Sequence, residues 1–231
     1  MICLLLQRKD FTMCGRYYVD EESNQELLKI IRNLDKRLQT SGSKTQNTPY
    51  HIKTGEIYPS DIVPIISNGK NSPCYEAMSW GFTNPNYRSL IINARSESAN
   101  QKPLFSKSLK EYRAVVPASG FFEWSHNEDK TKYYFTDPDD PIMYMAAIAK
   151  PDFNLSRFVI LTTAANKSME PIHNRMPVLL KKSEVSDYLM SEEYANEILR
   201  RTPYLLDYKP FKSYNEHTKS VNKYTQLRLP L

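Results

Sequence analysis

Four short segments of the sequence concentrate side chains that can react, transfer protons or bind phosphate. They are MCGRYY (13–18), INARSES (92–98), PASGFFEW (117–124) and IHNRMP (172–177). Cys14 offers a thiol and Asn93 an amide, and Glu123 and His173 can each accept or donate a proton. Each residue also has a plain structural reading: Asn93 could cap a helix starting near Ser96, and Glu123 could be a solvated residue at a strand end. Chemistry is therefore indicated only if the four segments meet in the fold.

Cys14 raises the most specific question, because it directly follows a methionine. If Met13 were an initiator that is removed, Cys14 would carry a free amine and a free thiol on adjacent carbons. Such a 1,2-aminothiol condenses with an aldehyde to a Schiff base, and the thiol then closes a thiazolidine ring. The α-amino group titrates at about 7.7–8.0, so part of it is neutral at physiological pH. The nitrogen of an internal cysteine is instead tied up in an amide, so we expect residues 1–12 to be an extension that the working protein lacks.

Several other kinds of site find no support in the sequence. It contains no Walker loop, no G-x-G-x-x-G, no H-E-x-x-H and no G-x-S-x-G motif. The histidines are scattered and the cysteines (Cys3, Cys14 and Cys74) lie far apart, so we expect no metal, no cofactor and no disulfide framework. This cysteine usage fits a reducing cytoplasm. The N-terminal apolar run ICLLL does not read as a signal peptide, and no apolar run is long enough to cross a bilayer.

The pattern of the chain predicts one α+β domain with mostly antiparallel sheets. Residues 23–39 form an amphipathic helical pattern, residues 40–55 read as a loop, and residues 62–80 read as a hairpin that turns at Asn68-Gly69. Further strands are expected at 113–118, 120–124, 131–135, 142–149 and 157–163, and helices at 183–190 and 191–201. Many short strands with few helices favour this class over a parallel α/β fold.

Seven motifs in one order resemble the SOS response-associated peptidase (SRAP) family. In chain order they are MCGRYY, MSWGF (78–82), INARSES, KPLF (102–105), PASGFFEW, LTTAAN (161–166) and IHNRMPVLL (172–180). The resemblance extends from Cys14 to about residue 225, so the SRAP domain is assigned to residues 13–231. It implies an irregular, barrel-like core of antiparallel sheets with flanking helices and a positively charged cleft. The chain departs from the usual pattern at MAAIA (145–149), before IVPII (62–66) and in residues 1–12.

The resemblance also implies a function, namely the sensing of abasic sites in single-stranded DNA during the response to DNA damage. Cys14 would react with the sugar aldehyde of the abasic site and form a covalent DNA–protein crosslink. Glu123 would act as general acid and base, Asn93 would hold the amine or the sugar, and His173 would act on the sugar oxygen. The residues that would bind the DNA itself are Arg16, Arg95, Arg175 and Trp124.

Two other classes of function remain open from the sequence. In one, Cys14 is the nucleophile of a peptidase or amidohydrolase, assisted by His173 and Asn93, which could also cut off its own leader. In the other, the protein is a non-covalent module for single-stranded DNA, consistent with the net charge of +5 and a pI near 8.9. In all three cases we expect a monomer in the cytoplasm, associated with the nucleoid if the source is bacterial.

Overall fold

The computed structural model describes residues 15–20, 25–41, 50–69, 72–84, 87–126 and 130–211. Cys14, the extension at residues 1–12 and residues 42–49 of the predicted loop at 40–55 lie outside the described residues. Within the described part of the chain, no helix is long and apolar enough to cross a membrane.

The larger sheet curls into a closed ring. Its order is β13-β12-β4-β3-β8-β11-β14, with β7 added beside β12. A further pairing between β11 and β12 closes the ring of β12, β4, β3, β8 and β11, so the expected barrel-like core is confirmed. The strands of this sheet are β3 (Ile62–Asn68), β4 (Pro73–Trp80), β7 (Asn93–Arg95), β8 (Arg113–Ala118), β11 (Met143–Lys150), β12 (Arg157–Ala164), β13 (Arg175–Pro177) and β14 (Leu179–Leu180).

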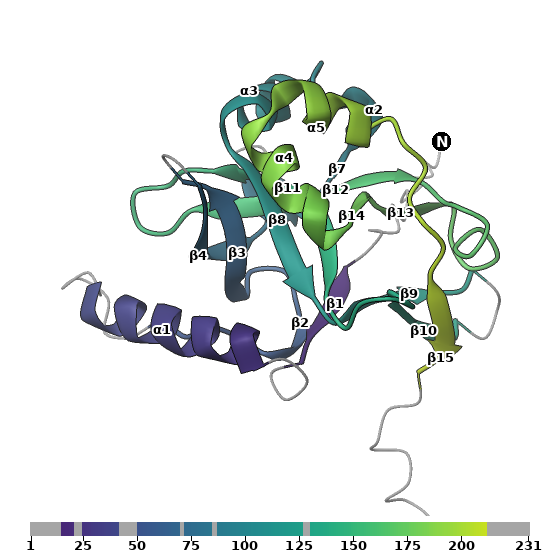
Figure 1. Cartoon of the computed structure of the whole chain (residues 1–231), viewed down its shortest axis with the longest axis horizontal. Coiled ribbons are helices and arrows are strands. Elements are labelled where there is room, and N and C mark those ends of the chain that lie inside the picture. The colour runs from purple at the N-terminus through teal and green to yellow at the C-terminus, as the bar shows by residue number, and fades with distance from the viewer. Residues whose placement is uncertain are drawn as a thin grey trace, which may run out of the picture.

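A second sheet of five strands is wholly antiparallel and has the order β15-β10-β9-β1-β2. Its strands are β1 (Arg16–Val19), β2 (Gly55–Ile57), β9 (Gly120–Trp124), β10 (Lys132–Thr136) and β15 (Asp207–Pro210). Only Ser119 separates β8 from β9, so the chain runs from the barrel directly into this sheet (Figure 1). A Cβ on Gly120 would lie 2.3 Å from the Phe135 carbonyl oxygen, so the crossing requires glycine.

Two groups of helices flank the sheets, and a short hairpin of β5 (Phe82–Asn84) and β6 (Tyr87–Ile91) completes the described elements. Helix α1 (Gln25–Ser41) buries Leu27, Ile31 and Leu34 and lies apart from the other helices (Figure 1). The remaining helices gather at one end of the barrel. They are α2 (Ser96–Ala99), α3 (Pro103–Glu111), the 3-10 helix η1 (Lys182–Glu184), α4 (Val185–Met190) and α5 (Glu192–Ile198).

Trp80 anchors the core where the two sheets meet. Its side chain is fully buried, and its indole nitrogen donates a hydrogen bond of 3.0 Å to the carbonyl of Ile92. The ring packs at centroid distances of 5.1 Å from Tyr17 of β1 and 6.4 Å from Phe158 of β12. Complete burial of such an aromatic ring stabilises the fold by about 1.5–3 kcal/mol or more. The core therefore fixes β1, which carries Arg16, against the strand that leads to the IHNRMP segment.

Candidate functional site

The pairing of β1 with β9 brings the MCGRYY and PASGFFEW segments together. Arg16 lies opposite Phe122 and Tyr17 opposite Phe121, in antiparallel register. Gly15, which precedes Arg16, is therefore at the level of Glu123 on the neighbouring strand. A cavity of about 490 Å³ opens at this end of the two strands. It is lined by Gly15, Arg16, Pro59, Leu90, Ile92 and Trp124.

Glu123 is buried, with only 5% of its surface exposed. It lies one residue before the end of β9 and shares a sheet face with the buried Phe121, because side chains alternate along a strand. The reading of Glu123 as a solvated strand-end carboxylate is therefore wrong. A carboxyl group in such a position loses much of its hydration, which is the setting in which enzymes keep proton-transfer groups.

His173 is held in one neutral tautomer. The backbone N–H of Arg175 donates a hydrogen bond of 3.1 Å to its Nδ1 atom, so the proton of the neutral ring is on Nε2. The ring is 6% exposed and lies 4.7 Å, between centroids, from that of His126, two residues beyond Trp124. Burial lowers the pKa of His173, and the nearby His126 lowers it further. At neutral pH the ring therefore presents an N–H donor and carries no charge.

The INARSES segment joins the same region through β7, which pairs in parallel with β12. Asn93 lies opposite Ile160 and Arg95 opposite Thr162. Asn93 is thus a strand residue; the short helix α2 does begin at Ser96, but Arg95 occupies its N-cap without a side-chain cap bond. The reading of Asn93 as a helix cap is wrong, because the extended chain of β7 reaches as far as Arg95.

Arg175 and Arg95 differ in how much of the guanidinium group is available. The Arg175 side chain is 16% exposed and forms an ion pair with Glu97 through both terminal nitrogens. One of these nitrogens also donates 2.6 Å to the carbonyl and 3.2 Å to the hydroxyl of Thr162. The hydrogen bonds from Arg175 lower the pKa of Glu97. Arg95 is exposed, so a phosphate could reach its guanidinium group directly.

Arg16 lies among aromatic and charged side chains. Its guanidinium carbon is 3.7 Å from the centre of the Tyr58 ring, and its Nε atom is 3.6 Å from a carboxylate oxygen of Glu56. Lys132 donates 2.7 Å to the same oxygen, and its ammonium lies 5.5 Å from the centre of the Trp124 ring. Positive charge beside a half-buried indole is a setting suited to stacked bases and phosphates.

Some residues that shape the site were not among those singled out from the sequence. Glu97 and Thr162 lie inside the INARSES and LTTAAN motifs, so their neighbours gave a signal for them. Lys132 is opposite Trp124 only through the pairing of β9 with β10, and no local pattern reveals this. In the part of the chain that the structure describes, no group of three or more His, Cys, Asp or Glu residues could hold a metal ion.

Comparisons with known proteins agree with this geometry. The family model for SOS response associated peptidase (SRAP) matches residues 13–223. The abasic site processing protein YoqW of Bacillus subtilis is 29% identical over 191 residues, covering 77% of this chain and 80% of that protein. For the abasic site processing protein YedK of Escherichia coli, the identity is 25% over 187 residues, covering 78% and 81%. A crystal structure from Bacteroides thetaiotaomicron superposes with a TM-score of 0.65 at 22% identity, covering 90% of this chain and 95% of that one. With the family model matching nearly the whole chain, the protein belongs to the SOS response associated peptidase (SRAP) family.

Proposed function

We propose that this protein processes abasic sites in single-stranded DNA by forming a covalent thiazolidine link through Cys14. The observation that carries the proposal is the register of β1 on β9, which puts Gly15, the residue after Cys14, level with the buried Glu123. The relatives named abasic site processing proteins support the same substrate. The reacting group would be the Cys14 amine, which requires that Met13 be removed.

The reaction balances without a cofactor. The neutral amine of Cys14 adds to the aldehyde carbon of the opened sugar, and loss of one water gives a Schiff base. The thiol then adds its sulfur to the same carbon and its proton passes to the nitrogen, which yields the thiazolidine. Glu123 would move the protons of both steps, since a positioned acid–base group contributes about 10²–10⁴-fold to such transfers. Asn93 would hold the amine or the sugar.

His173 would assist the opening of the sugar. Its Nε2–H can donate a hydrogen bond to the ring oxygen, on which negative charge develops as the ring opens. In the reverse direction the same contact would favour closure of the sugar and release of the protein.

The DNA contacts would be divided between charge and stacking. Arg16 and Arg95 would bind the phosphates that flank the lesion, and Trp124 would stack on a neighbouring base. A phosphate at Arg175 would share its guanidinium with Glu97, so we propose that Arg175 also keeps Thr162 and the His173 segment in place.

A denaturing gel with abasic single-stranded DNA tests the proposal. Wild-type protein is expected to give a shifted band without added reductant, and Cys14→Ala to give none. Cys14→Ser should give at most a weak, reversible imine, because a hydroxyl closes the ring poorly. A wild-type yield from Cys14→Ala would refute the thiazolidine link. Salt-sensitive binding with no covalent band would indicate a non-covalent module, and turnover of a peptide would indicate a hydrolase.

A further inference from the structure

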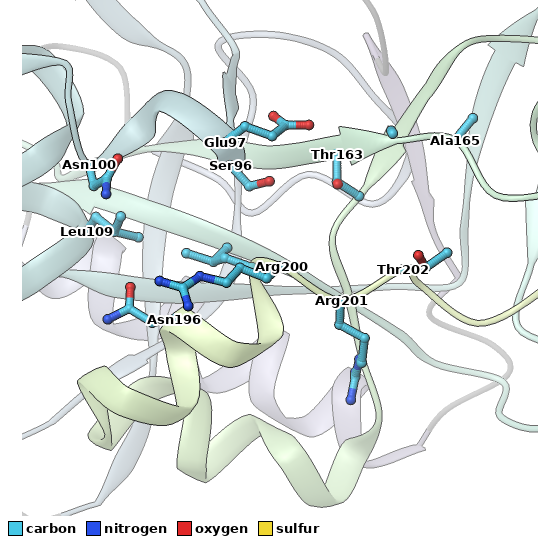
Figure 2. Close-up of a pocket in the computed structure, with 12 residues that line it drawn as sticks. Ser96, Glu97, Asn100, Leu109, Thr163, Ala165, Asn196, Arg200, Arg201 and Thr202 are labelled. Atoms are coloured by element: carbon cyan, nitrogen blue, oxygen red, sulfur yellow. The ribbon is translucent and has the colours of Figure 1, made fainter.

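A second pocket begins where β7 leads into α2, next to the end of β12. It has a volume of about 450 Å³ and opens between α2, α5 and the end of β12 (Figure 2). Its lining includes Ser96, Asn100, Leu109, Asn196, Leu199 and Arg200. The size falls in the range of about 300–1,000 Å³ that small-ligand sites occupy. Nothing in the proposed reaction uses this pocket.

The pocket contains a buried hydroxyl with no hydrogen-bond partner. Ser96 is 7% exposed, and among the described residues its Oγ atom makes no hydrogen bond. In Figure 2 this hydroxyl points across the pocket in the direction of Thr163. A buried polar atom without a partner costs about 1–3 kcal/mol of stability, so such an atom calls for an explanation. A ligand in the pocket would provide the missing partner.

Three further polar side chains line the same pocket. Asn100 and Asn196 are exposed, and each of their amides offers a donor and an acceptor. Arg200 is also exposed and extends into the pocket on the side of Asn196 (Figure 2). Arg201 instead turns away, since its guanidinium is held by Glu184 at 2.8 Å. The pocket therefore has one available guanidinium and two amides.

The floor of the pocket is apolar. Leu109 of α3 and Leu199, at the end of α5, are nearly buried and face it from two sides. A flat apolar ring with donors and acceptors along its edge matches this combination, because amide side chains can pair with the edge of a base. Arg200 could stack on that ring or bind the phosphate attached to it.

The pocket is also joined to the reaction site. Ser96 follows the exposed Arg95, and Thr163 of the lining follows Thr162, whose carbonyl accepts from Arg175. Glu97 both lines the pocket and forms the ion pair with Arg175. A DNA strand whose phosphate contacts Arg95 would pass the opening of the pocket, because Ser96 of the lining is the next residue of the protein.

We propose that this pocket binds one unstacked base of the DNA strand, adjacent to the abasic sugar, and so makes the protein selective for the neighbouring base. The inference rests on the proposed function only in that the same strand occupies the reaction site. A base read by hydrogen bonds is distinguished from the wrong base by about 10-fold or more.

The test uses abasic oligonucleotides that carry each of the four bases on either side of the lesion. The second-order rate of crosslinking by protein expressed from Met13, with Cys14 as its first residue, should vary by about 10-fold with the base at one of the two sides. Asn196→Ala should reduce this variation to about 2-fold or less, while Asn154→Ala, in the exposed turn between β11 and β12, should preserve it. Equal rates for all bases, or an unchanged preference in Asn196→Ala, would overturn the proposal.

Ser96→Ala separates a binding role from a structural one. If the hydroxyl serves a ligand, its removal should weaken the base preference and leave the midpoint of chemical denaturation unchanged or higher. A lower midpoint with the preference intact would overturn the role of Ser96. Equilibrium binding of intact oligonucleotides provides an independent readout of the base preference. A base preference in binding without any crosslink would therefore refute the covalent chemistry and support the base pocket. Crosslinking without any base preference would support the covalent chemistry and refute the base pocket.

Discussion

The Nδ1 atom of His173 accepts its hydrogen bond from the Arg175 amide, and this contact decides which proton the ring can offer. The Nε2–H is then the only donor of the neutral ring. Because burial and His126 lower the pKa of His173, the neutral form persists to a more acidic pH than in a free histidine. The ring can thus polarise a sugar oxygen without adding a positive charge beside Arg175.

We expect His126→Ala to raise the pKa of His173 towards its ordinary value, because it removes a group whose positive charge disfavours a second one. Since the folded-state pKa is below the unfolded one, protonation of His173 lowers stability as the pH falls below about 6.5, and the substitution should lessen that loss. An NMR titration of the imidazole C–H signals measures the shift. His51→Ala, near Asp35 on another part of the surface, is the control and should leave the titration of His173 unchanged.

Glu123→Gln should slow crosslinking by about 100-fold or more while DNA affinity stays near that of the wild type. The amide fills the same buried space at the end of β9 but cannot carry the proton. Pre-steady-state gels for the rate and fluorescence anisotropy for the affinity make the comparison. Equal losses in rate and affinity would show that Glu123 binds DNA and does not transfer protons.

Arg95→Ala should have the opposite effect to Glu123→Gln, because it should weaken DNA binding. The slope of log affinity against log salt concentration should become shallower by about 0.7, the value for one phosphate contact on a single strand. The side chain is exposed, so the fold should be unaffected. Anisotropy titrations at several salt concentrations give the slope. A slope equal to that of the wild type would remove Arg95 from the phosphate contacts.

The candidate residues could be chosen from the sequence because they occur in short motifs, but their contacts could not. The burial of Glu123 depends on β1 and β10 lying on either side of β9. The ion pair of Arg175 joins residues 78 positions apart in the chain. Such pairings depend on the whole fold, so the local sequence indicates candidate side chains but not which of them are held by other residues.

At the scale of elements, regular apolar patterns predicted the strands well and short polar elements poorly. The expected strands at 113–118 and 120–124 coincide with β8 and β9, and the hairpin at 62–80 is confirmed as β3 and β4. Strand β15 was missed because its four residues are all exposed and carry no alternation. Helix α3 was also missed, although the proline at its first position is a usual start signal.

Glu184 of η1 forms an ion pair with Arg201, just beyond α5, and its substitution should lower the stability of the fold. Its carboxylate accepts 2.6 and 2.8 Å hydrogen bonds from Arg201 and one of 3.0 Å from Tyr194. The bonds from Arg201 lower the pKa of Glu184 to about 2. Glu184→Gln should therefore cost about 1 kcal/mol at pH 7, allowing for solvent screening.

This contribution should depend on pH in a defined direction. With the folded-state pKa near 2, below the ordinary value, the stabilisation is complete above about pH 4.5 and is lost as the pH falls towards 2. Denaturation with urea across this range measures it, with the exposed Glu170→Gln as control. If Glu184→Gln were as stable as the wild type at pH 7, the ion pair with Arg201 would contribute nothing to the fold.

At the scale of the whole molecule, the barrel and the five-stranded sheet act as one support for the site. Strand β8 lies in the barrel and continues into β9, while the core around Trp80 joins β1 to β12. Glu123 lies in β9 of the five-stranded sheet and His173 lies two residues before β13 of the barrel sheet, and the ring of His173 contacts that of His126, two residues beyond β9. Gly15, the residue before β1, lines the cavity at this shared region, so the chemical state of the neighbouring Cys14 matters for the proposed reaction.

We therefore expect residues 1–12 to be incompatible with the covalent reaction. The family match begins at Met13, which fits a protein whose working chain starts there. Cysteine is small enough to permit removal of a preceding initiator methionine, and a retained extension would turn the reacting amine into an amide. Protein expressed from Met13 should crosslink abasic single-stranded DNA, and its mass should show Cys14 as the first residue.

The comparison protein keeps residues 1–14 and carries an uncleavable fusion at its N-terminus. Its intact mass confirms that nothing has been removed. It should bind the same DNA through Arg16 and Arg95 and yet give no band on a denaturing gel. Its amide nitrogen cannot form a Schiff base, so neither added time nor higher concentration should produce the adduct. Efficient crosslinking by the verified uncleaved protein, without reductant, would contradict the role assigned to the Cys14 amine and would require another nucleophile.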